Sequence, residues 1–431
     1  MTHLRVVVIA YACNPTRGSE DAVGWGWIHA IAQQHDVTVI TADYNRSAIE
    51  AWSRGAAGLK NNLQFRYVKN RAWHYRPWGF WAKIEASPAK PIMNLAYSNW
   101  LDHALQVAAA ETATGNYDLV HLITYVGWRF CGKFYQLDLP FVWGPVGGLM
   151  NTPWRLMPAL GFKGATYYAG RNAVNSLQIA LLPGPRRALR KAGGAVIAAT
   201  SEIQRALSTH FGSASRVICE VGLPDAEKAE PRLRASNEAL RICWSGPHVP
   251  GKALHLLLKA AALLPKGSNF SIEILGDGPF KKSWQALAQR LGVSDKCNWH
   301  GRLPRSAALE VMRTCHVFAI TSLKELTSTV AVEAISLGLP VVTLNHCGMA
   351  DMVTEACGLK IDVISVDQII QDFSLALTRL LKDEALRRSL SQGALARSQD
   401  YSWDRKVAVL NEIYALALSG SSRILAEARK A

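Results

Sequence analysis

Short apolar runs alternate with longer amphipathic stretches along this chain. The first run, residues 5–10, precedes a helical pattern at 24–33 and a second apolar run at 37–41. Strands that alternate with helices are typical of parallel sheets built from right-handed crossovers. The further strand candidates are residues 119–123, 141–143, 195–199, 216–220, 240–244, 270–275, 297–300, 317–320 and 341–344. We therefore predict an α/β fold of two doubly wound, Rossmann-like domains that face each other across a cleft.

The candidate domain boundary is the polar, Pro-containing segment LPDAEKAEPRLRASNEAL at 223–240. A chain of 431 residues exceeds what one hydrophobic core normally holds, so two domains are expected. We place them at residues 1–225 and 226–403. An amphipathic helix and a tail follow at 404–431.

The composition excludes several classes of protein. With 49% hydrophobic and 19% charged residues, the chain is typical of a globular protein and not of a disordered one. No apolar run approaches the ~20 residues of a membrane-spanning helix, and residues 5–10 fit a buried strand better than a signal peptide. The eight cysteines are scattered without a C-x-x-C pair, which favours reduced thiols and a cytoplasmic location.

The formal net charge of +15 predicts an anionic partner. Nucleic acid, an acidic membrane and a phosphorylated substrate all fit this charge. Because the sequence lacks helix-turn-helix, zinc-finger and RNA-binding sheet signatures, we do not expect nucleic acid as the partner.

The stretch ELTSTVAVEAISLGLP at 325–340 places a carboxylate in an apolar helix. It predicts a short helix at 329–337, with Thr327 or Ser328 as the N-cap and Gly338 as the stop. Glu333 is the one charged residue of this helix. A buried unpaired carboxylate costs several kcal/mol. Glu333 therefore needs a polar partner, which is either a residue from elsewhere in the fold or the hydroxyls of a ligand.

The start of the same helix is a candidate anion site. The amides of Thr327, Ser328 and Thr329 have no acceptor within the helix, and such helix N-termini bind phosphates. Glu325 lies just before them, after the strand expected at 317–320. The stretch fits a sugar nucleotide, with Glu325 near the sugar, the amides on the diphosphate and Glu333 on the ribose. The alternative is a solvated Glu325 and a Glu333 within a buried polar network.

Several motifs together resemble one enzyme family. The sequence ELTSTVAVEAISLGLPVV resembles the E-x7-E motif of retaining glycosyltransferases with the GT-B fold, the large family 4 that uses nucleotide sugars. The other similar segments are WSGPHVPGKALHLLLKAAALLP, ILGDGP, WHGRLPRSAALEVMRTCHVF, SWDRKVAVLNEIY, NPTRGSEDAVGWGW, YDLVHL and WGPVGG. The resemblance implies an acceptor side at 1–225, a nucleotide-sugar donor side at 226–403 and a last helix that crosses back to the first domain.

The resemblance also implies roles for individual residues. Glu325 would contact the hydroxyls of the transferred sugar, and Glu333 would hold the ribose. Lys252 would neutralise the diphosphate, whose charge grows as it leaves. Gly18 would let the backbone of the first domain approach the diphosphate.

Two positions leave alternatives open. His121, at the end of an expected strand, would face the reacting centre as a third catalytic residue, or it is a structural histidine. The family usually places an Arg directly after the strand glycine, which is Gly246 here, but this chain continues with Pro247 and His248. Either His248 or another cation substitutes for the Arg, or the diphosphate is held more weakly.

The expected reaction follows from these residues and from the resemblance. The sequence contains no D-x-D and no His/Cys cluster with ligand spacing, so we expect no metal and no cofactor beyond a UDP- or GDP-linked donor sugar. We expect a metal-independent, retaining hexosyltransferase that acts on a glycan or lipid-linked acceptor in surface or exopolysaccharide-type glycan synthesis. The alternatives are a non-catalytic nucleotide-sugar-binding partner subunit and a nucleotide-sugar epimerase on the same frame.

Basic and aromatic residues are interleaved in RYVKNRAWHYRPWGFWAK at 66–83. Trp73, Arg76, Trp78 and Trp81 suit either an acidic membrane surface or an acceptor pocket in which rings stack on sugars. The alternative is a lobe that covers the first sheet. The expected location is the cytoplasm, with peripheral contact at the inner face of the membrane as a further hypothesis.

Overall fold

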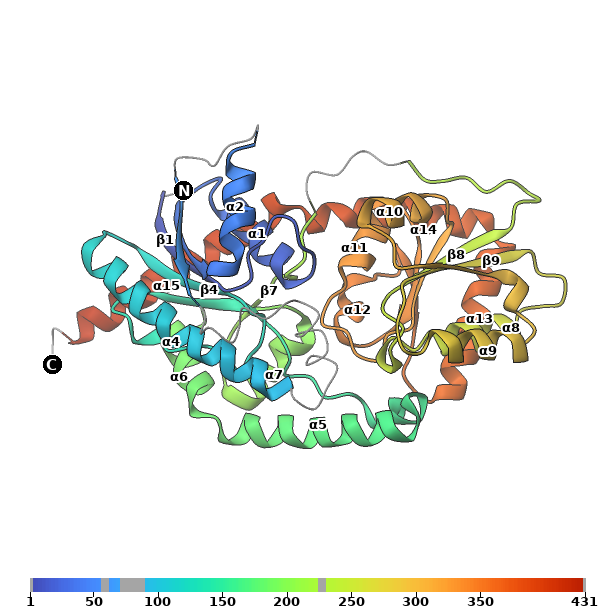
Figure 1. Cartoon of the computed structure of the whole chain (residues 1–431), viewed down its shortest axis with the longest axis horizontal. Helices are drawn as coiled ribbons and strands as arrows, with labels where there is room; N and C mark the ends of the chain where they lie inside the picture. Colours follow the sequence, from blue (N-terminus) through green and yellow to red (C-terminus); the bar gives the residue numbers. More distant parts are fainter. Residues whose placement is uncertain (1–2, 56–61, 70–89, 224–229, 429–431) are drawn as a thin grey trace. The chain divides into compact units, whose positions relative to one another are not determined.

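The computed structural model describes residues 3–55, 62–69, 90–223 and 230–428. The chain divides into two compact units. Unit 1 comprises Met1–Leu149, Ile179–Gly222 and Trp403–Ala431, and unit 2 comprises Met150–Gln178 and Leu223–Ser402. Figure 1 shows the elements of both units in the colours of the sequence.

Unit 1 contains a seven-stranded parallel sheet in the order β3-β2-β1-β4-β5-β6-β7. Its strands are β1 (Arg5–Ala10), β2 (Asp36–Ala42), β3 (Leu63–Val68), β4 (Leu119–Thr124), β5 (Phe141–Val146), β6 (Val196–Ala198) and β7 (Arg216–Val217). The central strands β4 and β5 are buried along their whole length. Burial on both faces is typical of a parallel sheet with helices on either side.

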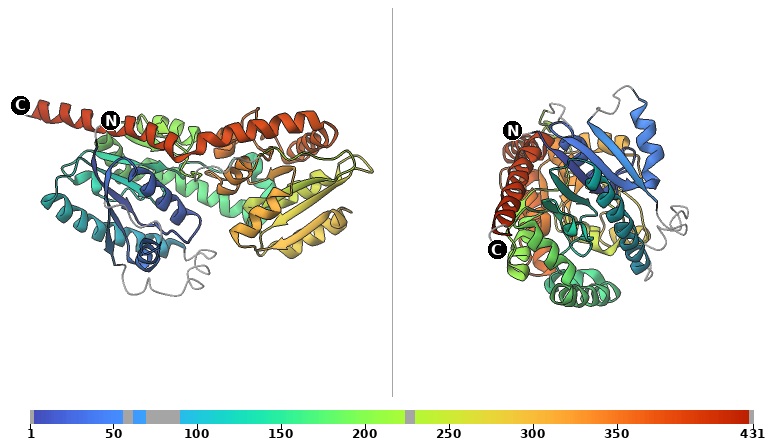
Figure 2. Two further views of the ribbon diagram at one scale, coloured as in Figure 1. Left: turned by 90° about the horizontal axis from the view of Figure 1, so that it is seen from above. Right: turned by 90° about the vertical axis from the view of Figure 1, so that its left-hand side faces the viewer.

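Helices surround both sheets (Figure 2). Those of unit 1 are η1 (Asp43–Asn45), α1 (Glu20–Ile31), α2 (Arg46–Ser53), α4 (Lys90–Thr114), η3 (Phe134–Gln136), α6 (Pro183–Ala192), α7 (Ser201–Phe211) and α15 (Trp403–Ala428). Thr200 caps α7, because its side chain accepts a hydrogen bond from the amide of Ile203 at 3.2 Å.

The C-terminal helix α15 packs on unit 1 through Trp403. A Cβ at Gly26 or Gly222 would lie 2.1 or 2.4 Å from the Trp403 ring, so both positions require glycine. The Trp27 ring lies 5.7 Å from the same ring. Further along the helix, Tyr414 is 1% exposed. The last helix therefore belongs to the first domain, as the sequence predicts.

Unit 2 contains a six-stranded parallel sheet in the order β10-β9-β8-β11-β12-β13. Its strands are β8 (Leu240–Ser245), β9 (Phe270–Leu275), β10 (Cys297–Gly301), β11 (Val317–Ile320), β12 (Val341–Leu344) and β13 (Gly358–Ile361). Its helices are η4 (Trp154–Leu160), α5 (Gly161–Leu181), η5 (Pro250–Lys252), α8 (Leu254–Ala262), α9 (Lys281–Arg290), η6 (Ser294–Lys296), α10 (Arg305–Arg313), α11 (Thr329–Ser336), α12 (Cys347–Met352), α13 (Val366–Lys382), α14 (Glu384–Ser398) and η7 (Gln399–Tyr401). The last residues of α5, 179–181, fall in unit 1.

The strand order reverses once in each sheet, between β1 and β4 in unit 1 and between β8 and β11 in unit 2. Ligands of open parallel sheets bind beyond the carboxyl ends of the strands at such a reversal. The two doubly wound, Rossmann-like domains that the sequence predicts are thus confirmed. The reversal between β8 and β11 also marks where a site in unit 2 is expected.

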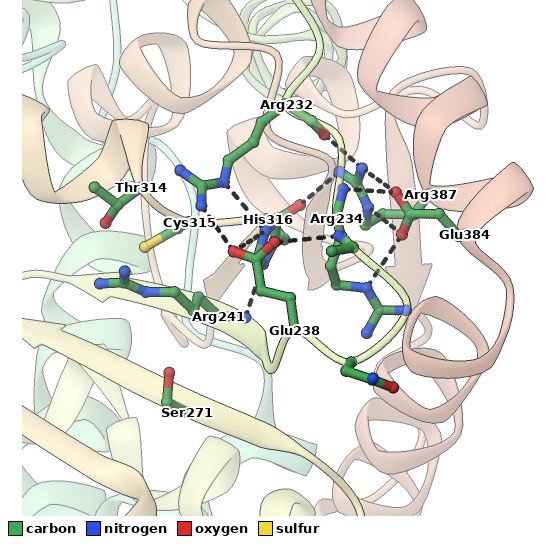
Figure 3. A network of polar contacts seen from close by, with 12 residues as sticks. Arg232, Arg234, Glu238, Arg241, Ser271, Thr314, Cys315, His316, Glu384 and Arg387 are labelled. Carbon is green, nitrogen blue, oxygen red and sulfur yellow. Dashed lines mark hydrogen bonds and ion pairs between the residues drawn. The ribbon is translucent and has the colours of Figure 1, made fainter.

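A polar network in unit 2 holds the chain before β8 (Figure 3). Arg387 of α14, whose side chain is 1% exposed, pairs with Glu384 and donates to the carbonyl of Arg232 at 2.6 Å. Arg234 donates to Glu384 Oε2 at 3.2 Å and to the carbonyl of Leu381 at 2.7 Å. Residues 232–234, inside the polar segment of the expected boundary, are therefore fixed to unit 2.

Two further expectations concern cysteines and membranes. All eight cysteines lie within the described ranges, and each is a free thiol. Among the helices of the described residues, none combines the length and hydropathy that a membrane-spanning segment needs.

Candidate active site

The loops that follow β8 and β11 lie side by side at the reversal of strand order in unit 2. Trp244 Nε1 donates to Thr321 Oγ1 at 3.0 Å, and Thr321 Oγ1 donates to the carbonyl of Lys252 at 2.7 Å. The amide of Leu323 donates to the carbonyl of Gly251 at 2.8 Å. These bonds fix the β8 loop against the β11 loop, so residues 252 and 325 have defined positions.

Lys252 and Glu325 form an ion pair between these two loops. Their side chains are 23% and 18% exposed, so both groups can be reached from solvent. An ammonium beside a carboxylate offers one group for a phosphate and one for a hydroxyl. The structure thus brings together two residues that the sequence predicts for the donor site and that lie 73 positions apart.

Gly246 directly follows β8 and makes a very close backbone contact. A Cβ on Gly276 would lie 2.0 Å from the Gly246 carbonyl oxygen, and Gly276 has a φ of +123°. A Cβ on Gly246 itself would lie 3.6 Å from Cδ of Lys252. Gly246 therefore borders the aliphatic stem of Lys252, and the close approach requires glycine at 276.

Helix α11 begins where the sequence predicts. Ser328 is the N-cap, and its hydroxyl accepts a hydrogen bond from the amide of Ala331 at 3.3 Å. The first backbone hydrogen bond of the helix joins the amide of Val332 to the carbonyl of Ser328. The amide of Thr329 therefore lies before the hydrogen bonds of the helix begin. Thr327 is 8% exposed. The first turn of α11 thus has the geometry of an anion site.

Glu333 is 7% exposed and has a partner within unit 2. Arg305 Nε, at the start of α10, lies 2.6 Å from Glu333 Oε1. Of the two partners that the sequence left open, the structure shows a residue from elsewhere in the fold. The Arg305 side chain is 67% exposed, so solvent reaches the pair from one side. Sequence reasoning missed Arg305.

His248 does not provide a cation in place of the family's Arg. Its side chain is 0% exposed, and its ring lies 5.7, 5.2 and 5.7 Å from the rings of Trp244, Trp284 and Trp299. Burial lowers the pKa of His248, and neither ring nitrogen has a hydrogen-bond partner among the described residues. Burial among apolar rings thus disfavours the charged imidazolium at this position.

His121 lies inside β4 in unit 1, not at an exposed strand end. It is 0% exposed, and its two ring nitrogens are 2.9 Å from Tyr414 Oη and 2.8 Å from the Gly144 carbonyl. Burial lowers the pKa of His121 to about 4. Because both nitrogens are engaged and the ring is neutral, this placement argues against the catalytic role and for the structural alternative.

Gly18 lies in the loop between β1 and α1 of unit 1. It is exposed, and no heavy atom lies within 4 Å of a Cβ built on it. Ser19, which follows, has a φ of 58°. An open loop before a helix can approach a ligand closely. The donor contact of Gly18 remains a prediction.

Four tyrosines gather where strands of unit 1 end, and sequence reasoning missed them. The ring of Tyr11 lies 5.7, 5.0 and 5.0 Å from those of Tyr44, Tyr97 and Tyr125. Tyr44 donates to Asp21 Oδ1 at 3.0 Å. Tyr11 and Tyr125 each follow an apolar run directly, a signal that the sequence does contain. Tyr11 and Tyr97 are only 7% and 3% exposed, so the partly exposed Tyr44 and Tyr125 are the members that a carbohydrate could reach.

Glu20→Gln is expected to raise the free energy of unfolding at pH 8 and to leave it nearly unchanged at pH 4.5. Burial raises the pKa of Glu20 from 4.5 to about 8, and Glu220 adds repulsion. The stabilising contribution of the protonated group is therefore complete below pH 4.5 and is lost as the pH rises to 8. Gln keeps the neutral form, so the gain at pH 8 is about 1–3 kcal/mol. Urea unfolding at both pH values measures this gain in the free energy of unfolding.

Glu50→Gln, at an exposed residue, is the control. An equal effect of both variants on the free energy of unfolding would contradict the expectation.

The aromatic and basic residues of the acceptor or membrane prediction lie outside the described residues. They are Trp73, Arg76, Trp78 and Trp81.

Residues 225–397 match the family model of the glycosyl transferases group 1. The chain is 26% identical over 347 residues to D-inositol 3-phosphate glycosyltransferase of Streptomyces bingchenggensis, and the match covers 75% of this chain and 71% of that protein. Sucrose-phosphate synthase from Thermosynechococcus elongatus has a similar structure, with a TM-score of 0.64 at 16% identity over 97% of this chain and 100% of that one. Anabaena Alr3699/HepE in complex with UDP also has a similar structure, with a TM-score of 0.57 at 16% identity over 97% of this chain and 100% of that one.

The family match contains the residues of the site in unit 2. Lys252, Glu325 and Glu333 all lie between the ends of the matched range. The similar structures cover nearly the whole chain and agree with two parallel Rossmann-like sheets. The chain therefore has the GT-B fold, and its residues 225–397 match the family model of the glycosyl transferases group 1.

Proposed function

We propose that this protein is a retaining, metal-independent hexosyltransferase that uses a UDP- or GDP-linked sugar as its donor. The observation that carries the proposal is the Lys252–Glu325 ion pair beside the N-terminus of α11. Both residues lie within the range that matches the group 1 glycosyl transferases. The complex of Anabaena HepE with UDP supports a nucleotide-linked donor.

The donor fits the site through its charges. The diphosphate would lie on the amides at the start of α11 and take Lys252 as its counter-ion. Glu325, released from Lys252, would then accept hydrogen bonds from the sugar hydroxyls. Glu333 would accept hydrogen bonds from the ribose hydroxyls through one carboxylate oxygen, while its other carboxylate oxygen stays bonded to Arg305. The ion pair thus holds both side chains in place until the donor arrives.

The proposed reaction exchanges one bond at the anomeric carbon. The bond from this carbon to the diphosphate oxygen breaks, and a bond to the acceptor hydroxyl oxygen forms on the same face. The hydroxyl proton passes to the departing diphosphate, which leaves as the nucleoside diphosphate. Lys252 and the amides of α11 stabilise the negative charge that develops on the leaving group.

We assign the acceptor to unit 1 and the donor to unit 2. Tyr44 and Tyr125, which are partly exposed beside the buried Tyr11, would offer rings to an acceptor near the carboxyl ends of β2 and β4. The relative that transfers sugar to D-inositol 3-phosphate supports a hydroxyl-rich acceptor. We propose a glycan or lipid-linked acceptor of surface or exopolysaccharide synthesis, used in the cytoplasm.

One observation favours a second candidate function, a nucleotide-sugar-binding partner subunit without turnover. Pro247 stands where the family usually has an Arg, and burial disfavours the charged form of His248. Lys252 would then hold the diphosphate with less help than in other members. This candidate predicts that nucleotides bind and that no sugar is transferred.

Nucleotide-dependent stabilisation tests both candidates. UDP or GDP at about 100 times its dissociation constant is expected to stabilise the protein by ~2.7 kcal/mol. A thermal-shift screen with UDP, GDP and ADP measures this, and the absence of any shift would overturn the donor site. Donor-sugar hydrolysis and transfer are then followed with EDTA present, with NMR of the anomeric configuration of the product. Binding without turnover would support the partner subunit, and inhibition by EDTA would contradict metal independence.

A further inference from the structure

Helix α5 presents an apolar stripe to solvent. Tyr167, Val174, Leu177 and Leu181 are 61%, 53%, 59% and 68% exposed, and Gly170 between them is exposed as well. At 3.6 residues per turn, spacings of three, four and seven place these residues on one side of the helix. We call these five residues the α5 face. Surface helices normally turn their polar side outward, so this face needs an explanation.

The opposite side of α5 shows why the helix keeps this orientation. Asn172 and Asn175 are only 4% and 3% exposed. Asn172 accepts from the Thr152 amide at 3.0 Å and donates to the Thr152 carbonyl at 2.8 Å. Asn175 donates to Asn151 Oδ1 at 2.9 Å. A rotation that buried the α5 face would break these bonds, so the apolar side is held outward by specific contacts.

The sequence segment that contains α5 has basic residues and no acidic ones. Residues 139–201 contain no Asp or Glu and seven Lys or Arg residues. Three of these, Arg155, Lys163 and Arg171, lie on or directly before the helix. Trp154 and Phe162 beside them are 68% and 86% exposed. Exposed aromatic and aliphatic side chains next to basic ones are typical of helices that lie in a membrane interface.

We propose that the α5 face docks reversibly on an anionic lipid bilayer, with α5 lying in the plane of the interface. Anionic headgroups complement the positive charge of residues 139–201, which contain no Asp or Glu. A second copy of this chain would bring the same positive charge to the same place and be repelled. The proposal extends the proposed function, because a lipid-linked acceptor lies at such a surface, but it rests on α5 alone.

Sedimentation with vesicles tests the α5 face. The full-length protein is expected to bind vesicles of equal parts phosphatidylglycerol and phosphatidylcholine, and to bind less as salt is added or when the vesicles contain phosphatidylcholine alone. The triple variant Tyr167→Gln, Val174→Gln, Leu177→Gln is expected to lower the partition coefficient about tenfold or more.

The matched control removes three apolar residues of similar exposure from other surfaces of unit 2. They are Leu263, Ile364 and Leu375, which are 56%, 57% and 63% exposed. Their change to Gln is expected to leave the partition coefficient within about twofold, since they do not belong to one stripe. Circular dichroism and the melting temperature show that both triple variants are folded.

Three outcomes would overturn the proposal. The first is an absence of vesicle binding by the unaltered protein. The second is unchanged binding by the α5 variant, which would move the contact elsewhere, for example to residues 66–83. The third is a dimer that the α5 variant loses in light scattering, which would make the face a subunit interface. The rate of donor hydrolysis without vesicles should be equal in all variants. A failure of the proposed donor site can therefore be distinguished from a failure of membrane docking.

Discussion

Glu325→Gln is expected to abolish sugar transfer while the protein stays folded. The amide cannot supply the charge that strengthens hydrogen bonds to the sugar, and the expected loss of turnover is about 100-fold or more. The ion pair with Lys252 is partly exposed, so its removal should change the free energy of unfolding by no more than ~1 kcal/mol. Transfer rates at saturating donor and the melting temperature measure the two effects.

Two companion variants separate catalysis from binding and folding. Lys252→Met is expected to weaken the stabilisation by UDP or GDP, because Lys252 is the proposed partner of the diphosphate. Glu310→Gln, whose side chain is 75% exposed on α10, is the matched control and should leave turnover unchanged. A Glu325→Gln protein with full turnover would remove Glu325 from the mechanism, and a lower melting temperature would assign it a structural role.

Central elements could be predicted from the sequence because their signals are local. Helix α11 was expected at 329–337 with a Ser or Thr cap, and it is found at Thr329–Ser336 with Ser328 as the cap. The strands β3 and β13 were missed. Both lie at the edge of a sheet, where one side has no neighbouring strand. Edge strands tolerate polar residues such as Arg66 and Lys360, so the continuous apolar run of a central strand is absent.

The contacts within the site depend on tertiary structure that no local pattern encodes. The sequence indicated Lys252 and Glu325 one by one, but their ion pair follows from the pairing of β8 with β11. The Arg305 partner of Glu333 comes from a different helix. His248 stands beside a glycine loop in the sequence, which suggested a cation, yet the fold buries it among tryptophans.

His121 shows the same limit across a longer separation. Its place at the end of an expected strand, together with the family resemblance, suggested a residue that faces the reacting centre. Its partner Tyr414 lies 293 positions further along the chain, on the helix that returns to unit 1. A pairing over this distance could not be anticipated from spacing, and it favours the structural role of the two that were considered.

Arg387→Met is expected to cause the largest loss of stability in unit 2. The guanidinium is 1% exposed and pairs with Glu384, and it donates to the carbonyls of Arg232 and His316 at 2.6 and 3.5 Å (Figure 3). Met fills much of the volume but leaves the Glu384 carboxylate and the Arg232 carbonyl without this donor. Glu384 is 34% exposed and keeps Arg234 as a partner, so the loss comes mainly from the buried carbonyl acceptors and is expected to be about 1–3 kcal/mol. The midpoint of the unfolding transition of unit 2 in urea measures the loss.

Two further variants show whether the loss comes from the unpaired charge. Arg388→Met, at the exposed neighbouring residue, is expected to stay within about 0.5 kcal/mol of the unaltered protein. Adding Glu384→Met to Arg387→Met should recover part of the stability, because the carboxylate that has lost the Arg387 donor is then removed. Recovery would be incomplete, since Arg234 also donates to Glu384. Equal small shifts for the variants at 387 and 388 would mean that the network in Figure 3 adds little to the stability of unit 2.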